Sequence, residues 1–317
     1  MFDWLIKAFS EHNCNVKGVN KLNIVTYHRV SDTYDITNPK NIQYHEFVNQ
    51  LSWLKKHFVV LPLPLAIELC EKNALPKRAV CITVDDGYRD SYDIIFKALQ
   101  AIDLTATFFI STEGLERGSL WDERIYHAIF SAKSSVSQIK VDGVIYSLKN
   151  QQERINSRYM LTELAKDMTL YRREKLTNSL YTQCAVEKTN NNFLNANQIQ
   201  EMHNAGMTIG AHTHGHPILA QESTSCAFNE IKKSKDILEG IINSPVNYFA
   251  YPNGKIGQDF TDEHIAMVEK IGFNAALSTD WGALSDMKQD RFKIKRFTPW
   301  DRTEFRFAFR LANNYRS

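Results

Sequence analysis

The sequence has few of the residues that break regular structure or cross-link small folds. It holds 13 glycines and 8 prolines in 317 residues, which excludes collagen-like and low-complexity chains. Its five cysteines are odd in number, and no two of them form a CxxC pair: Cys14, Cys70, Cys81, Cys184 and Cys226. This pattern excludes a disulfide framework and a paired-cysteine zinc site, so we expect reduced thiols.

The chain also lacks a charge of one sign and a long apolar run. Lysine and arginine (38) nearly balance aspartate and glutamate (36), for a net charge of +2. Such a balance provides no field to hold a phosphate backbone, and we expect no nucleic-acid partner. The longest apolar stretch, 59–70, contains Pro62 and Pro64 and is shorter than the ~18 residues of a membrane span.

The first residues do not follow the pattern of an export signal. Asp3 stands where such a signal is basic, and Lys7 interrupts the apolar region, so we expect a cytoplasmic protein. The apolar residues of this stretch follow helical spacing: Phe2, Leu5, Ile6 and Phe9. Residues 1–12 are therefore expected either to pack on the main domain or to associate weakly with the inner face of a membrane. The sequence does not indicate an oligomeric state.

Short apolar runs with the length of buried strands recur along the chain. They are 22–27, 79–84, 105–110, 207–211, 246–250, 273–277 and 292–297. Helical spacing between them, as in Phe47, Leu51, Leu54 and Phe58, predicts covering helices. This alternation predicts an α/β fold with a parallel sheet or barrel.

The alternation breaks in the middle of the chain, which predicts an inserted subdomain. A hairpin signal around Asp142-Gly143 is followed by a long helical stretch from 151 to about 180. Asn195 or Asn197 is expected to cap the next helix. We therefore expect an N-terminal helix within 1–20, a barrel over 21–300 interrupted by an insertion at 115–195, and a C-terminal helix at 301–317.

Polar residues gather where four of the predicted strands end. They are His28, the pair Asp85 and Asp86, the segment from His212 to His216, and the segment from Tyr251 to Gly254. In a βα barrel the carboxyl ends of all strands meet on one face, so these residues are expected to share a pocket.

Two of these clusters suggest a metal site. Adjacent carboxylates such as Asp85 and Asp86 repel unless a cation or a basic side chain lies beside them, although an Asp-Gly turn alone also produces such a pair. If the 212–216 segment turns helically, His212 and His216 share a face and His214 points elsewhere. Two histidines and one aspartate would leave an open side for water and substrate.

A lone histidine such as His28 is more often structural, but hydrolysis of an amide needs a proton donor for the departing amine. At these residues the chain resembles a known family. The segments 83–88, 106–110 and 212–217 resemble the polysaccharide deacetylases of carbohydrate esterase family 4, the NodB-homology domain. The resemblance covers about 22–298 without the insertion. It implies a distorted barrel of seven or eight βα units.

The resemblance also implies roles for individual residues. Asp86, His212 and His216 would bind one divalent metal, most commonly zinc, with cobalt, nickel, iron or manganese as alternatives. Asp85 would be the base and Arg296 would orient it. The Tyr251-Pro-Asn253-Gly segment would help to hold the oxyanion through the tyrosine backbone N–H. A Leu-x-His motif near the C-terminus is missing, and Tyr27-His28 resembles the N-terminal Tyr-His pair of permuted biofilm-polysaccharide deacetylases, which gives His28 the role of acid.

The expected activity is a metal-dependent hydrolysis of N-acetyl groups on an amino sugar, with acetate released. Trp121, Trp281 and Trp300 are candidates for stacking on the sugar. Rival readings are an O-acetyl esterase or cyclic-amide hydrolase on the same scaffold, an iron oxygenase with two histidines and one carboxylate, and a sugar-binding module without catalysis. The sequence leaves open whether the saccharide is polymeric, lipid-linked or nucleotide-linked.

Overall fold

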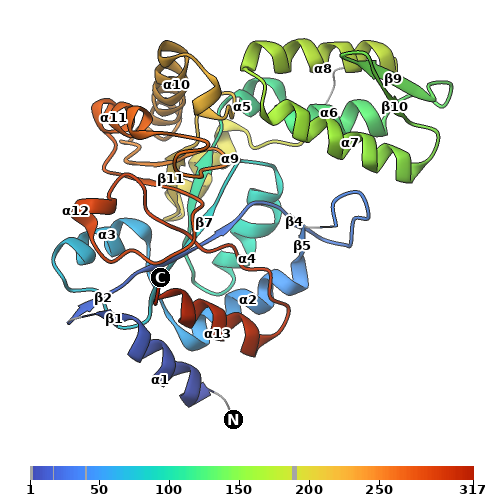
Figure 1. Ribbon diagram of the computed structural model, residues 1–317. Helices are drawn as coiled ribbons and strands as arrows, with labels where there is room; N and C mark the ends of the chain where they lie inside the picture. Colours follow the sequence, from blue (N-terminus) through green and yellow to red (C-terminus); the bar gives the residue numbers. More distant parts are fainter. Residues whose placement is uncertain (1–2, 17, 40, 188–190) are drawn as a thin grey trace.

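A computed structural model describes residues 3–16, 18–39, 41–187 and 191–317, and its centre is a curled parallel sheet (Figure 1). Within these residues the sheet has seven strands in the order β13-β12-β11-β8-β7-β3, with β6 paired to the start of β7. The strands are β3 (Asn23–Tyr27), β6 (Val59–Val60), β7 (Ala79–Val84), β8 (Thr107–Ile110), β11 (Thr208–Ala211), β12 (Tyr248–Ala250) and β13 (Ala275–Leu277). The expected α/β class and barrel-like sheet are confirmed.

The strand ends that carry polar residues agree with the sequence. Six predicted runs end at the residue where a strand ends, although five of these strands begin one or two residues later than expected. Strand β6 was not predicted, because two valines before a proline-rich turn give no periodic signal.

The seventh predicted run, 292–297, is not a regular strand, and this part of the prediction is wrong. The segment crosses from one edge of the sheet to the other and makes a single parallel bridge to each. The N–H of Ile294 donates to the carbonyl of Ala276 beside β13 (2.9 Å), and the N–H of Phe297 donates to the carbonyl of Ile24 in β3 (2.8 Å). The segment therefore closes the barrel without a continuous ladder to either neighbour.

Helices cover the outside of the sheet (Figure 1). They are α1 (Asp3–Asn13), α2 (Tyr44–His57), α3 (Leu63–Glu71), the π-helical turn η1 (Ser91–Phe96) with α4 (Lys97–Gln100), α9 (Ala196–Asn204), α10 (Thr224–Ile242), α11 (Asp262–Ile271), α12 (Met287–Asp290) and α13 (Glu304–Asn314). Short pairs join β1 (Asn15–Val16) to β2 (Val19–Asn20) and β4 (Val30–Ser31) to β5 (Ile42–Gln43). Asn195 caps α9, as predicted, by accepting a hydrogen bond from the N–H of Gln198.

Helix α1 packs against α13 and α2. Ile6 is buried, and Phe9 stacks on Phe309 with ring centroids 5.1 Å apart, whereas Trp4 is 68% exposed. Phe2, which completes the predicted stripe, lies outside the described residues. Among those residues, the structure contains no helix with both the length and the apolar character needed to cross a membrane. All five cysteines are free.

Residues between β8 and α9 form a helical subdomain beside the sheet (Figure 1). It contains α5 (Glu113–Arg117), α6 (Trp121–Phe130), α7 (Gln151–Lys166), α8 (Leu170–Cys184) and the hairpin β9 (Gln138–Val141) and β10 (Val144–Ser147). The predicted turn is present, with positive φ at Asp142 and Gly143. The helical stretch expected from 151 to about 180 is present as two helices, because Thr169 caps a new one by accepting from the N–H of Arg172. The buried side chains of 121–184 form their own apolar cluster.

Gly210 in β11 has no room for a side chain, so adding one methyl group there should destabilise the protein. A Cβ on Gly210 in β11 would lie 2.5 Å from the ring of Phe109 and 3.1 Å from the carbonyl oxygen of Tyr248. We expect Gly210→Ala to lower the free energy of unfolding by about 1–3 kcal/mol, the usual cost of overpacking. Denaturant unfolding measures it. Gly240→Ala in α10, where the methyl group meets open space, is the control and should stabilise by up to ~1 kcal/mol.

Candidate active site

Two adjacent aspartates follow β7, and the backbone turns sharply between their side chains. Asp86 has φ +80° and Gly87 has φ +98°, and a Cβ at Gly87 would lie 2.8 Å from Ile110. Only glycine fits such a close approach at positive φ. The turn sends the carboxylate of Asp85 toward the barrel interior and that of Asp86 toward the end of β11. The repulsion between neighbouring carboxylates is thereby relieved by giving each one a different partner.

Asp86 faces two imidazoles. Its Oδ1 lies 3.5 Å from Nε2 of His212 and 3.3 Å from Nε2 of His216, and the three ligand atoms lie within 4.8 Å of one another. Ligand atoms of a tetrahedral zinc site at ordinary bond lengths are about 3.3 Å apart. The three side chains therefore already have the spacing of a divalent metal site.

The hydrogen bond of His212 and the charge of Asp86 indicate which ion the site can bind. Its Nδ1 donates to the carbonyl of Ala250 (2.7 Å), which leaves Nε2 as the atom turned toward the carboxylate. Burial alone would raise the pKa of Asp86, but hydrogen bonds with His212 and His216 outweigh burial and hold that pKa well below its usual value. An ionised carboxylate that faces two imidazole nitrogens is stabilised by positive charge between them, which either a proton on an imidazole or a metal ion supplies. The donor set fits a divalent cation.

The 212–216 segment is not helical. The prediction that a helical turn places His212 and His216 on one face is therefore wrong. The segment is an irregular turn with positive φ at Thr213 and His216, and the Thr213 hydroxyl accepts from the N–H of His216 (3.1 Å). The outer histidines still meet at one point. His214 points elsewhere, with its ring nitrogens 2.8 Å from Thr112 Oγ1 and 2.8 Å from Lys233 Nζ. Burial and the neighbouring lysine lower the pKa of His214 to about 4.

Asp85 forms a buried ion pair with Arg296. The distances are 2.8 Å from Nη1 to Oδ1 and 2.7 Å from Nη2 to Oδ2, and the two side chains are 0% and 1% exposed. The guanidinium also donates to the carbonyl of Ser278 (2.8 Å) and the hydroxyl of Thr26 (3.1 Å). Burial would raise the pKa of Asp85, but Arg296 and then His212 outweigh it and hold the pKa below its usual value. The carboxylate is thus ionised and fixed in orientation.

His28 follows β3 at the rim of the same site. Its side chain is 44% exposed, and its Nε2 lies 3.9 Å from Oδ2 of Asp85, which is beyond hydrogen-bond distance. The imidazole is therefore near the carboxylate and remains accessible to another proton acceptor.

A cleft of about 190 Å³ holds these groups together. It is lined by His28, Asp85, Asp86, Trp121, Asp122, Thr162, Lys166, His212, His216, Tyr251, Asn253 and Thr279. An adjoining hollow of about 610 Å³ shares His28, Lys166, Asn253 and Thr279 with it. The sequence analysis named Trp121 of α6 but missed Asp122 beside it and Thr162 and Lys166 of α7, for which spacing gives no signal. It also missed Thr279, which follows the end of β13 and could have been found by the rule that selected His28.

Tyr251 lines the cleft, but its backbone does not suit the role that the resemblance gave it. Its N–H donates to the carbonyl of Leu277 (3.1 Å), because the chain continues the parallel pairing with β13, and it is not free for an oxyanion. Its hydroxyl donates to the carbonyl of Phe292 (3.0 Å). The side-chain amide of Asn253, two residues on, lies on the cleft wall and donates to no other residue among those described.

The three tryptophans proposed as sugar platforms lie in different places. Trp121 is in the cleft but buried, with the guanidinium of Arg173 4.4 Å from its ring centroid. Trp281 and Trp300 are exposed, and their ring centroids lie 4.8 Å apart. Neither is among the residues that line the cleft.

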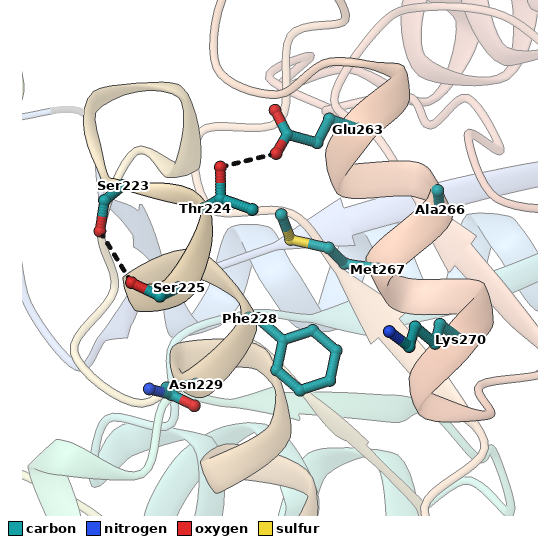
Figure 2. A pocket seen from close by; sticks show the side chains of 9 residues that line it. All are labelled: Ser223, Thr224, Ser225, Phe228, Asn229, Glu263, Ala266, Met267 and Lys270. Atoms are coloured by element: carbon teal, nitrogen blue, oxygen red, sulfur yellow. Dashed lines mark hydrogen bonds between the residues drawn. The ribbon is translucent and has the colours of Figure 1, made fainter.

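A larger groove of about 690 Å³ lies between α10 and α11 (Figure 2). Phe228 and Met267 form its apolar floor, and Thr224 donates to Glu263 across it. It shares no lining residue with the cleft and contains no pair of catalytic or ligating groups. We therefore place the chemistry in the smaller cleft.

The comparisons with known proteins identify the family. The model of the family described as "Polysaccharide deacetylase" matches residues 72–150 and 159–276, more than half of the chain. The chain belongs to the polysaccharide deacetylase family. This makes it a member of a family of carbohydrate deacetylases, as the resemblance at the strand ends implied.

Individual relatives are distant in sequence. YxkH of Bacillus subtilis (strain 168), whose name places it among the polysaccharide deacetylases, is 20% identical over 267 residues, 84% of this chain and 67% of its own. The deacetylase PplD of Streptococcus pyogenes is similar with a TM-score of 0.61 at 20% identity, over 89% of this chain and 93% of its own. A de-N-acetylase from Aggregatibacter actinomycetemcomitans has a TM-score of 0.58 at 15% identity, over 88% and 94%. These similarities support the fold.

The buried ion pair predicts a pH-dependent loss of stability. We expect Arg296→Met to lower the free energy of unfolding by about 3–5 kcal/mol near neutral pH, because Asp85 is left buried without its cation. Without Arg296, burial raises the pKa of Asp85 in the folded variant. Below that pKa the carboxyl is neutral, so the difference between variant and wild type in the free energy of unfolding should shrink. Denaturant unfolding from pH 7 to pH 4 measures this. Arg291→Met, which removes a surface pair with Glu71, should cost under ~1 kcal/mol at every pH.

Proposed function

We propose that the protein is a metal-dependent hydrolase that removes N-acetyl groups from amino sugars of a polysaccharide and releases acetate. The observation that carries this proposal is the placement of Asp86, His212 and His216 at metal-ligand spacing beside an ionised, Arg296-held Asp85 in one cleft. Two structural relatives, a deacetylase in complex with acetate and a de-N-acetylase, support the choice of bond.

Asp86, His212 and His216 would hold the ion. Two imidazoles and one carboxylate favour zinc, and cobalt, nickel, iron or manganese are the alternatives. When bound, such an ion supplies Lewis acidity, which lowers the pKa of a water molecule and polarises an acetyl carbonyl. A site with three protein ligands would leave room for both the water and the acetyl group of the substrate.

Asp85 is proposed as the general base. Its lowered pKa keeps it ionised at neutral pH, and Arg296 fixes both of its oxygens in place. A low pKa makes a carboxylate a weak base, but the water to be deprotonated is itself acidified, so the two proton affinities approach each other. Arg296 thus serves as a positioning residue for the base.

His28 and Asn253 are proposed to complete the reaction. Cleavage of the amide C–N bond expels an amine that must take up a proton, and His28 lines the cleft with an accessible Nε2. The oxygen of the acetyl group needs a hydrogen-bond donor as negative charge develops on it. Because the Tyr251 N–H is already engaged, we assign that donor to the side-chain amide of Asn253.

The organisation of the chain fits a polymeric substrate. The adjoining hollow of about 610 Å³ offers polar and charged side chains on which further sugars of a chain could hydrogen-bond, among them Gln221 and Gln258. We propose that the 115–195 segment forms one wall of this binding region, with the barrel of 21–300 supplying the chemistry. A cytoplasmic location and a membrane contact through residues 1–12 stay predictions.

The two neighbouring aspartates give the sharpest test of this function. We expect Asp86→Asn to lose both bound metal and acetate release from N-acetylglucosamine oligomers, because a three-ligand site without one ligand holds its ion poorly. Asp85→Asn should keep the metal and lose most of the turnover. Elemental analysis and an acetate assay on both variants and on wild type measure this.

Equal metal loss in the two variants would refute the division of roles. No acetate release by metal-loaded wild type from any N-acetylated sugar would refute the function itself, and release from O-acetylated sugars alone would support an esterase. Asparagine is the matched substitution, since it keeps the shape of each side chain and tolerates the positive φ of Asp86.

His28→Gln should lower kcat by ~10²–10⁴ with the metal retained, as expected for loss of a general acid. The effect should be smaller on an ester substrate whose leaving alcohol is more acidic than a sugar hydroxyl, since that group needs less help from a proton donor. Steady-state kinetics on an amide and an activated acetate ester compare the two. Equal losses on both would assign His28 a role other than acid.

A further inference from the structure

Arg173 in α8 is buried without a carboxylate partner. Its side chain is 1% exposed, and no carboxylate oxygen among the described residues lies within 4.0 Å of its nitrogens. The guanidinium instead donates to three backbone carbonyls: Ala165 (Nε, 2.7 Å), Lys166 (Nη2, 2.9 Å) and His216 (Nη1, 3.0 Å). Burial lowers the pKa of Arg173 to about 10, so it remains a cation at neutral pH. A buried guanidinium that makes no direct ion pair is costly, and such an arrangement calls for a reason.

The third carbonyl connects the subdomain to the proposed metal centre. His216 has φ +55°, a left-handed conformation that is strained for a residue other than glycine. Its carbonyl oxygen receives two donors from the subdomain, Nη1 of Arg173 and the indole N–H of Trp121 (3.2 Å). These bonds hold the peptide in the turn that places the imidazole 3.3 Å from Asp86.

A second, half-buried arginine shows that packing of the subdomain alone does not explain these contacts. Arg154 in α7 also donates to backbone carbonyls, at Leu148, Ile129, Phe130 and Ala132. All four acceptors lie inside the subdomain. Arg173 is different because it joins the end of α7 to the 212–216 turn of the barrel.

We propose that Arg173 is a positioning residue of the metal centre, which fixes the left-handed turn at His216 and so anchors the helical subdomain to the metal site. The inference rests on the proposed function, because it requires that His216 be a metal ligand. The same guanidinium binds the last carbonyls of α7, the helix that provides Thr162 and Lys166 to the cleft. The Arg173 side chain thus contacts both the backbone of the proposed ligand His216 and the end of α7, which lines the cleft.

The test is the metal affinity of the full chain, measured without any substrate. Metal-free wild type, Arg173→Met, Arg173→Lys and Arg154→Met are titrated with Zn²⁺ against a competing chelator. We expect Arg173→Met to weaken zinc binding by ~10–100-fold, the usual effect of losing an outer-shell partner of a ligand. The zinc affinity of Arg173→Lys should lie between those of Arg173→Met and wild type. Arg154→Met, which removes a comparable set of half-buried hydrogen bonds to backbone carbonyls, should bind zinc within about twofold of wild type.

The visible absorption of the cobalt-loaded proteins is the second readout. The Arg173→Met spectrum should differ from that of wild type, and the Arg154→Met spectrum should not. If Arg173→Met fails to fold, Trp121→Phe removes the other donor to the same carbonyl while keeping the ring, and it should also weaken zinc binding. Equal zinc affinities in Arg173→Met and wild type, or equal losses in Arg173→Met and Arg154→Met, would overturn the inference. Zinc binding by wild type without acetate release would instead refute the proposed function and leave this inference standing.

Discussion

The guanidinium of Arg296 and the carboxylate of Asp85 are both removed from water, and neither charge is tolerable in the barrel without the other. Arg296 lies on the segment that bridges the two edges of the sheet, while Asp85 follows β7, the neighbour of the edge strand β3. Closure of the barrel and orientation of the carboxylate are therefore one event. The position of Asp86, one residue further along a sharply turning backbone, depends on the same pair.

The strand ends were the part of the fold that the sequence determined best. Buried parallel strands are rich in apolar residues, and the change from Val84 to Asp85 or from Ala211 to His212 marks where a strand ends. Strand beginnings were less certain, because Leu22 and Met207 are buried without belonging to a ladder. Apolarity reports burial rather than backbone pairing.

The site was predicted in its residues and less well in its geometry. The histidine pair was chosen on the assumption of a helical turn, whereas positive φ at Thr213 and His216 brings the rings together. A β-branched residue such as Thr213 rarely adopts that conformation, so the sequence does not signal it. The engaged N–H of Tyr251 depends on pairing with Leu277, which only the folded sheet defines. The contributions of Arg173, Thr162 and Lys166 arise from packing between segments far apart in sequence, where periodicity carries no information.

The partner of Asp85 comes from 211 residues further along the chain. Bringing such distant groups together requires the closure of a very long loop, whose entropic cost is met only after the intervening elements have ordered. A chain emerging from the ribosome can assemble β3, β7, β8 and β11 before residue 296 has been made. Throughout that interval Asp85 has no cation beside it, so the nascent barrel must remain open to water at this point. The charge pair can therefore complete the cleft only after residue 296 has been synthesised.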